Sequence, residues 1–221
     1  MYQHQWVSGE SILLPTGKAV CVGRNYAAHA AELNNPVPEQ PLLFIKPASA
    51  FVNLDEQLVL PRPNLHFETE LALLIGAQLS ADHAHDPIKA ITAVTLGLDL
   101  TDRTLQDELK AKGQPWERAK AFDGALPLGT WLPINQMPEN PNDWSFTLEL
   151  NGERRQHGEL SQLLFPLEAL LLEIVQNFRL EPGDVVLTGT PAGVGQLKPG
   201  DSLELSIEQT EWRHKTVVAS D

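Results

Sequence analysis

Two glutamates one residue apart give this sequence its most specific chemical signal. They lie in the stretch His66-Phe-Glu-Thr-Glu-Leu-Ala-Leu-Leu-Ile75. Side chains alternate between the two faces of a β-strand, so Glu68 and Glu70 point the same way if this stretch is extended. Two like charges held side by side repel each other unless a cation or a shared proton lies between them. The pair predicts either a cation site or a solvated strand end with two ordinary carboxylates.

A third carboxylate favours the cation site. Asp99 interrupts the apolar run Val94-Thr-Leu-Gly-Leu-Asp-Leu-Thr101, and a buried carboxylate is rarely left without a partner. Three carboxylates that enter from apolar strands, with no cysteine or histidine at ligand spacing, form an oxygen-only donor set. Such a set suits a hard divalent ion, Mg²⁺ first, with Mn²⁺ or Ca²⁺ as alternatives. Zinc is disfavoured, and we leave His66 out of the ligand set.

A histidine and a glutamate form a second candidate group. His29 and Glu32 lie in the alanine-rich segment Tyr26–Leu33, which we predict to be a helix with Asn25 as its N-cap. A spacing of three residues places both side chains on one helical face. A carboxylate beside an imidazole orients the ring and raises its basicity, which makes a general base for water. The same pair is also typical of an ordinary helix surface.

Basic residues and a glycine-rich loop complete the candidate chemistry. Arg103 and Gln106 follow Asp99 closely, and Lys120 comes shortly after them. Cations and an amide near a metal could hold an anionic substrate and its developing negative charge. The loop Thr188-Gly-Thr-Pro-Ala-Gly-Val-Gly195 lacks the Gly-Lys-Ser/Thr ending of a P-loop, but its backbone amides could bind a carboxylate.

Short apolar runs predict that strands position these groups. Asn151-Gly152 predicts a hairpin with a type I′ turn, and Glu181–Asp184 and Lys198–Asp201 each predict a type II turn. Helical spacing is clearest at Leu163–Phe178, and Leu105–Lys112 forms a second helix in this interpretation. The chain is therefore a β-rich α/β protein without alternating strands and helices. The predicted strands are Ala19–Val22, Leu42–Ile45, Leu58–Leu60, Leu71–Ile75, Phe146–Leu150, Val185–Leu187 and Leu203–Ile207.

Composition limits the classes of protein. The 221 residues are 42% hydrophobic and fit one domain at 17–221 after a short N-terminal segment at 1–16. A net charge of −13 argues against nucleic acid as a partner. No apolar run approaches the ~18 residues of a membrane span, and the N-terminus does not read as a signal peptide. The single cysteine, Cys21, excludes an intrachain disulfide, so we expect a cytoplasmic protein.

Taken together and in order, these motifs resemble the fumarylacetoacetate hydrolase family. The resemblance runs from about residue 17 almost to the C-terminus and is closest to the compact acylpyruvase-type branch. It rests on Val22-Gly-Arg-Asn-Tyr-Ala-Ala-His29 with Glu32, Leu43-Phe-Ile-Lys-Pro47, His66-Phe-Glu-Thr-Glu-Leu71, Asp99-Leu-Thr-Asp-Arg103, Lys120-Ala-Phe-Asp123 and Leu187-Thr-Gly-Thr-Pro191.

The resemblance implies a fold and a set of roles. The fold is a mixed β-sandwich or β-roll of the family's C-terminal-domain type, with few helices and usually paired as a homodimer. Some family members add a carboxylate to the metal shell near the histidine, but this sequence has none there, so water would complete the coordination. The implied roles are a divalent ion on Glu68, Glu70 and Asp99, a water-activating dyad of His29 and Glu32 on a mobile lid, Lys120 at the reaction centre, and Arg24, Arg103, Gln106 and Thr190 around the substrate.

The implied substrate is a small 2-oxo acid that chelates the ion. Our first interpretation is hydrolysis of a carbon–carbon bond in a 2,4-dioxo acid such as an acylpyruvate or fumarylpyruvate. The same pocket would support oxaloacetate decarboxylation, keto–enol tautomerisation, or isomerisation of an unsaturated dicarboxylate. A metal-stabilised binding protein without catalysis is a further alternative, although it leaves His29 and Lys120 unexplained.

Overall fold

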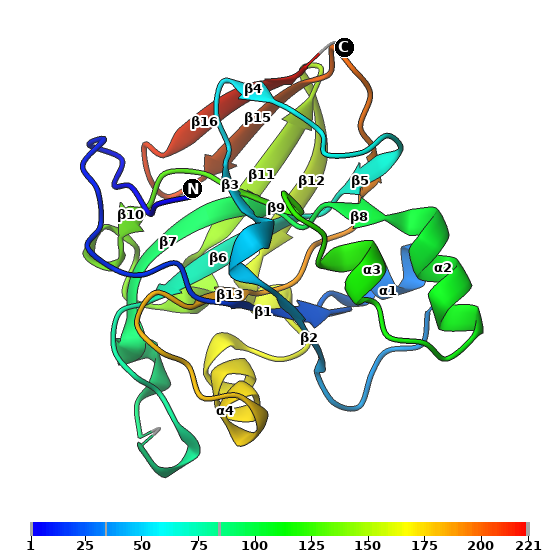
Figure 1. Ribbon diagram of the computed structural model, residues 1–221. Coiled ribbons are helices and arrows are strands. Elements are labelled where there is room, and N and C mark those ends of the chain that lie inside the picture. Colours follow the sequence, from blue (N-terminus) through cyan, green and yellow to red (C-terminus); the bar gives the residue numbers. More distant parts are fainter. Residues whose placement is uncertain (1, 34, 84, 220–221) are drawn as a thin grey trace.

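Curled β-sheets account for most of the regular secondary structure in the computed structural model (Figure 1). The structure describes residues 2–33, 35–83 and 85–219. Within these residues the largest sheet has eight strands, and strands from distant parts of the chain are neighbours in it. Its order is β2 (Leu42–Lys46), β1 (Ala19–Gly23), β13 (Val185–Leu187), β6 (Thr69–Ile75), β7 (Ile91–Leu98), β9 (Leu126–Leu128) and β3 (Phe51–Asn53), with β10 (Leu132–Pro133) paired to β7.

Two further sheets and a few helices complete the described part of the chain. The second sheet runs β12 (Glu153–Glu159), β11 (Ser145–Leu150), β15 (Ser202–Ile207), β16 (Arg213–Val218) and β4 (Gln57–Leu58). The third runs β14 (Gly195–Gln196), β5 (Leu65–Phe67) and β8 (Thr101–Asp102). The α-helices are α1 (Ala27–Glu32), α2 (Arg103–Ala111), α3 (Glu117–Lys120) and α4 (Leu167–Asn177). Single 3₁₀ turns lie at Ala48–Ala50, Ala81–His83, Pro87–Ala90, Ile134–Gln136, Pro141–Asp143 and Leu160–Gln162. The predicted β-rich class with few helices is confirmed.

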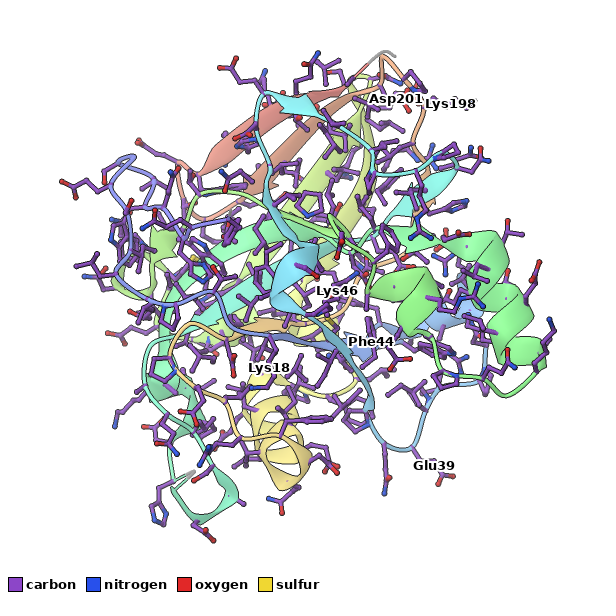
Figure 2. The ribbon with its side chains drawn as sticks, in the orientation of Figure 1. Lys18, Glu39, Phe44, Lys46, Lys198 and Asp201 are labelled. Atoms are coloured by element: carbon purple, nitrogen blue, oxygen red, sulfur yellow. The ribbon has the colours of Figure 1, made fainter. Side chains whose placement is uncertain are left out.

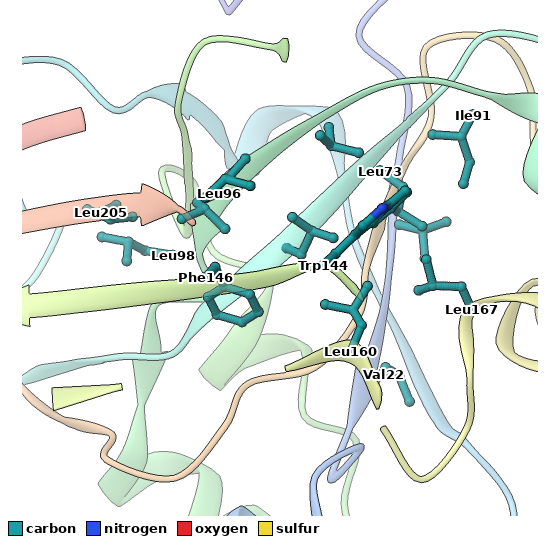
Figure 3. Close-up of a cluster of buried hydrophobic side chains, with 14 of the residues drawn as sticks. Val22, Leu73, Ile91, Leu96, Leu98, Trp144, Phe146, Leu160, Leu167 and Leu205 are labelled. Atoms are coloured by element: carbon teal, nitrogen blue, oxygen red, sulfur yellow. The ribbon is translucent and has the colours of Figure 1, made fainter. Parts of the chain in front are cut away.

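The main core lies where the two larger sheets and α4 face one another (Figure 3). Leu73 and Leu96 come from the eight-stranded sheet, Phe146 and Leu205 from the five-stranded sheet, and Leu167 from α4. Burial of one large apolar side chain such as Phe146 stabilises the fold by roughly 2–3 kcal/mol. The core therefore fixes β6 and β7, which carry the acidic motif at their ends.

Two helices begin later than predicted, and both differences have tertiary causes. The helix predicted at Leu163–Phe178 begins at Leu167, because the chain before Pro166 is extended and Leu163 forms a bridge with Tyr26. The N-cap prediction for Asn25 is wrong, since Tyr26 precedes α1 in extended conformation. The Asn25 side chain instead accepts from the Phe165 backbone N–H at 2.8 Å and donates to the Thr188 carbonyl at 2.9 Å.

The acidic stretch is two strands instead of one. Leu65–Phe67 joins the three-stranded sheet, Thr69–Ile75 joins the eight-stranded sheet, and Glu68 lies at the crossing between them. The predicted strand at Leu58–Leu60 is shorter, since pairing ends at Leu58. The second predicted helix begins two residues early, at Arg103, because the Asp102 carboxylate caps it by accepting from the Leu105 N–H at 3.1 Å.

The predicted turns are confirmed. Asn151 and Gly152 have φ angles of 54° and 79° and connect β11 to β12, as a type I′ turn requires. The two Pro-Gly-Asp turns share one local structure, with φ of 94° at Gly183 and 87° at Gly200. In each turn the aspartate carboxylate accepts from the backbone N–H three residues earlier, at 2.9 Å for Asp184 and 2.8 Å for Asp201.

These matched turns allow a test of local packing. Alanine at Gly200 would meet no atom within 4 Å, so we expect only the strain of positive φ, about 1 kcal/mol of unfolding free energy. Alanine at Gly183 would also collide with the Pro15 carbonyl oxygen, so we expect a loss of at least about 3 kcal/mol. Urea denaturation of both variants measures the difference, and equal losses would contradict the packing explanation.

The N-terminal segment packs on the edge of the large sheet. The Trp131 backbone N–H donates to the Gln5 carbonyl at 2.8 Å, and the Trp131 indole donates to the Tyr2 hydroxyl at 3.1 Å. The domain boundary at residue 16 stays a prediction.

Cys21 is buried, and burial raises the pKa of its thiol, in agreement with an inert cysteine. No helix in the described part of the chain has the length and apolar character needed to cross a membrane.

Candidate active site

Strand pairing brings the three predicted carboxylates together. β6 and β7 run antiparallel with Glu70 opposite Gly97, and the Asp99 N–H donates to the Glu68 carbonyl at 2.8 Å. Glu68, Glu70 and Asp99 are 5%, 2% and 1% exposed, and one oxygen from each lies within 4.8 Å of the others. The spacing in the sequence therefore becomes one buried acidic cluster. His66 is not part of it and lines a separate outer groove.

Three cations surround this cluster. The Lys120 ammonium, at the end of α3, lies 2.7 Å from Glu68 Oε2 and 2.6 Å from Asp99 Oδ2. Arg103, at the start of α2, pairs with Glu68 and donates to Gln106 Oε1 at 2.6 Å. Lys46, at the end of β2, lies 2.8 Å from Asp99 Oδ1. Two of the three cations come from short helices, Arg103 from α2 and Lys120 from α3. These helices lie with α1 on one side of the molecule, beside β5 and β8 (Figure 1).

The cations act unequally on the carboxylates. Burial would raise the pKa of Glu68, but the charges of Lys120 and Arg103 outweigh it and hold the pKa well below its ordinary value. Burial raises the pKa of Glu70, and the charges of Asp99 and Glu68 raise it further. Glu70 accepts the Gly189 N–H at 2.7 Å, which offsets only part of this repulsion. Glu70 is thus the member of the cluster that most needs another cation.

The donor set fits a divalent ion. The cluster offers carboxylate oxygens alone, which are the ligands of hard cations such as Mg²⁺ and Mn²⁺. Lys120 already places a positive charge between Glu68 and Asp99, so this position attracts cations. A divalent ion would also offset the repulsion that raises the pKa of Glu70. These three residues could therefore hold a metal ion, as the sequence predicted.

His29 and Glu32 form a pair on α1. His29 Nδ1 lies 3.3 Å from Glu32 Oε2, and Glu32 Oε1 accepts the Gly193 N–H at 3.0 Å. Burial lowers the pKa of His29, although the charge of Glu68 and the hydrogen bond that the ring donates to the Glu32 carboxylate oppose it. A lowered pKa keeps the imidazole neutral near pH 7, in the form that accepts a proton. The glutamate orients the ring and ties α1 to the glycine-rich loop.

One small cavity of about 30 Å³ joins the acidic cluster to this pair. Phe44, Trp116 and Lys110 form other parts of its wall. Glu32 lines the neighbouring groove, and Asp99, which is 1% exposed, is not among the cavity-lining residues but pairs with Lys120, which is one of them. The predicted site residues that line the cavity directly are Arg24, His29, Glu68, Glu70, Arg103, Gln106, Lys120 and Thr190.

Two buried polar residues of the site were missed at the level of sequence. Lys46 is fully buried, and its ammonium donates to the carbonyls of Lys120 and of Ala125, the latter at 3.1 Å, besides its pairing with Asp99. It lies on β2 two residues after Phe44 (Figure 2). The ring centre of Phe44 is 5.4 Å from the Lys120 ammonium. A lysine that ends an apolar strand, as in Leu43-Phe-Ile-Lys-Pro47, was an available signal.

Gln156 is the second missed residue. It lies on β12, yet its amide accepts the Thr69 N–H at 3.0 Å and donates to Thr190 Oγ1 at 2.7 Å and to the Pro191 carbonyl at 2.9 Å. One side chain therefore joins the centre of the Glu-Thr-Glu motif to the glycine-rich loop at Thr190 and Pro191. Its polar surroundings in sequence, Glu153–Glu159, gave no signal of a buried role.

Comparisons with known proteins show the family of this chain. The family model described as fumarylacetoacetate (FAA) hydrolase C-terminal matches residues 18–218. The chain belongs to the fumarylacetoacetate hydrolase family. It is 42% identical over 210 residues to oxaloacetate tautomerase YcgM of Escherichia coli (strain K12), which covers 94% of this chain and 96% of that protein. The resemblance inferred from the motifs is confirmed.

Two further family members are similar over most of their length. The mitochondrial oxaloacetate tautomerase fahd-1 of Caenorhabditis elegans is 43% identical over 192 residues, covering 86% of this chain and 89% of that protein. The crystal structure of fumarylpyruvate hydrolase from Pseudomonas aeruginosa, in complex with Mn²⁺ and pyruvate, has a TM-score of 0.88 and 32% identity. That match covers 100% of this chain and 96% of the other, so the predicted family fold is confirmed.

Proposed function

We propose that the chain is a Mg²⁺-dependent enzyme that interconverts the keto and enol forms of oxaloacetate, a small 2-oxo dicarboxylic acid. One arrangement carries the proposal: His29, a base, and Lys120, a cation, line the same buried cavity as Glu68 and Glu70. The identity of 42% to an oxaloacetate tautomerase supports it. Tautomerisation was an alternative at the level of sequence, and the comparisons favour it over our first interpretation, hydrolysis.

The reaction moves one proton and breaks no carbon–carbon bond. In the keto-to-enol direction a base takes a proton from carbon 3 and, once protonated, gives a proton to the oxygen on carbon 2, so the base ends in its starting form. Neutral His29 is the group that can take the proton from carbon 3, because burial lowers the pKa of its ring. Glu32 fixes the ring orientation through the 3.3 Å contact with Nδ1. A binding protein without catalysis would have no use for this oriented base.

Lys120 stabilises the negative charge that develops on the oxygen of carbon 2. Burial would lower the pKa of its ammonium, but the charges of Asp99 and Glu68 outweigh burial and raise the pKa above its ordinary value. Lys120 therefore stays protonated and acts as a hydrogen-bond donor and fixed charge, not as a base. A Mg²⁺ ion held by Glu68, Glu70 and Asp99 would add Lewis-acid stabilisation of the same negative charge.

Hydrolysis of a 2,4-dioxo acid is the second candidate. The structural similarity to a fumarylpyruvate hydrolase that holds Mn²⁺ and pyruvate favours it. The same His29–Glu32 pair would activate water instead of taking a proton from carbon.

The homodimer and the cytoplasmic location stay predictions.

A substrate panel tests the proposed function. The ultraviolet absorbance of enol-oxaloacetate reports tautomerisation, and a coupled assay for pyruvate reports decarboxylation and acylpyruvate hydrolysis in parallel. We expect fast tautomerisation with Mg²⁺, loss of this activity in EDTA and its return when Mg²⁺ is added again. The reason is that the ion, and not the carboxylates that would hold it, stabilises the negative charge of the enolate. Undiminished activity in EDTA would contradict the metal proposal, and hydrolysis without tautomerisation would reverse the order of the two candidates.

A further inference from the structure

Positive charge is concentrated at one place in an acidic protein. The chain has 16 lysines and arginines and a net charge of −13. Four of these basic residues nevertheless line the small cavity that contains Glu68, Glu70 and His29: Arg24, Arg103, Lys110 and Lys120. Lys120 and Arg103 are neutralised by Glu68 and Asp99. The carboxylate cluster therefore leaves two cations, Arg24 and Lys110, to be explained.

Arg24 has no partner among the residues that the structure describes. It directly follows β1 with a φ angle of 60°, a conformation that is uncommon for residues other than glycine. Its side chain is half-buried in the cavity wall and makes no ion pair or hydrogen bond within the described residues. Holding a cation partly away from water without a partner costs free energy. Such a residue is typical of a site that receives an anion.

Lys110 approaches the same space from α2. Its side chain is 21% exposed, its ammonium lies 5.5 Å from the centre of the Trp116 ring, and Asp107 Oδ1 is 3.7 Å away. Asp107 is largely exposed, so water screens this pair. Burial lowers the pKa of Lys110, and the charges of Arg103 and, to a smaller extent, Arg24 lower it further. Lys110 and Arg24 line the same small cavity.

The position of Lys110 marks the outer end of the cavity. Lys110 lines both the inner cavity and an outer groove of about 310 Å³. The groove also carries Glu32 and Asp107, so the excess of positive charge lies inside, where Arg24 is. Glu68 and Glu70 line the same inner cavity but are only 5% and 2% exposed, whereas the Lys110 side chain is 21% exposed. A substrate held at both ends would span these two regions.

We propose that Arg24 and Lys110 form a subsite for the distal carboxylate of the substrate, the one that is not adjacent to the oxo group. This inference rests on the proposed function, which places the oxo acid end at Glu68, Glu70 and Asp99. Two cations that line one cavity favour a second carboxylate over an apolar group there. The site therefore selects small dicarboxylates over monocarboxylates of the same length.

A matched pair of inert ligands tests this subsite without turnover. L-Malate and 2-hydroxybutyrate share one end, and they differ because a methyl group replaces the distal carboxylate. Calorimetric titration of the Mg²⁺-loaded protein measures both affinities. We expect malate to bind about 10- to 100-fold more tightly, the range for a charge-assisted hydrogen bond to a buried partner. Equal affinities, or binding of neither ligand, would overturn the proposal.

Three variants assign the preference to residues. Arg24→Met should remove most of the preference for malate and leave the affinity for 2-hydroxybutyrate unchanged, and Lys110→Met should remove a smaller part. Lys112→Met is the matched control, because it removes the same charge from an exposed position after the same helix. Arg24→Gly relieves the positive φ angle and provides a second, folded variant. If Arg24→Met and Arg24→Gly weaken both ligands equally, Arg24 has a structural role instead.

The ligand titration and the activity assay can fail separately. A wild-type protein that prefers malate but does not tautomerise oxaloacetate would refute the proposed function and keep the subsite. A protein that tautomerises oxaloacetate but binds both ligands equally would refute the subsite and keep the function.

Discussion

Replacing Glu70 by glutamine is expected to reduce Mg²⁺-dependent turnover by about 10³-fold or more. Loss of the Lewis acid removes several kcal/mol of transition-state stabilisation, and about 1.4 kcal/mol corresponds to a factor of ten in rate. Glutamine has the same shape, and its amide oxygen can still accept the Gly189 N–H. The change therefore removes a charge from the acidic cluster and leaves the surrounding contacts in place. Steady-state kinetics at saturating Mg²⁺ measures the loss.

Thermal unfolding supplies a second readout for the same variant. Without metal we expect Glu70→Gln to be at least as stable as the wild type, because it relieves the repulsion from Asp99 and Glu68 that raises the pKa of Glu70. With Mg²⁺ the wild-type Tm should rise through mass action, and the variant should lose this rise. Glu204→Gln, which removes an exposed ion pair with Lys215, is the control and should change neither result. A variant that keeps both the activity and the rise would remove Glu70 from the metal site.

The motifs of the candidate site could be predicted from the sequence because each depends on local geometry. Glu68 and Glu70 share a direction through the alternation of an extended chain, which holds even though the chain crosses between two sheets at Glu68. The His29–Glu32 pair follows from helical spacing in the same way. The two Pro-Gly-Asp turns were predicted because glycine at positive φ is a property of the turn alone. Signals of this kind need no knowledge of the sheet order.

The missed features depend on contacts between distant residues. Asparagine is a preferred N-cap residue, but the Asn25 side chain forms its hydrogen bonds with Phe165 and Thr188, 140 and 163 positions away in the sequence. Gln156 reaches the Glu-Thr-Glu motif only because the β11–β12 hairpin packs beside it. Local patterns contain no information about such pairings. The sheet order, with β13 between β1 and β6, was beyond prediction for the same reason.

Replacing His29 by alanine should separate the reactions that share this pocket. Removal of a positioned general base typically costs about 10²–10⁴-fold in rate, and we expect a loss of that size in oxaloacetate tautomerisation. Decarboxylation of oxaloacetate needs enolate stabilisation but no base at carbon 3, so any such activity should fall much less. Parallel enol absorbance and pyruvate assays measure both rates. His157→Ala, in a second histidine–glutamate contact on the surface, is the matched control and should change neither.

Glu32→Gln tests the same base through its pH dependence. Because burial lowers the pKa of His29 below its ordinary value of 6.5, the acid limb of kcat/KM in the wild type should lie below pH 6.5. The hydrogen bond and charge of Glu32 raise this pKa, so the variant should move the acid limb to still lower pH. A weaker base also transfers protons more slowly, so the plateau rate should fall as well. An acid limb that does not move in Glu32→Gln would contradict this role of the pair, and so would equal losses of tautomerisation and decarboxylation in His29→Ala. In either case the pair would be a structural element of α1, and another group would transfer the proton.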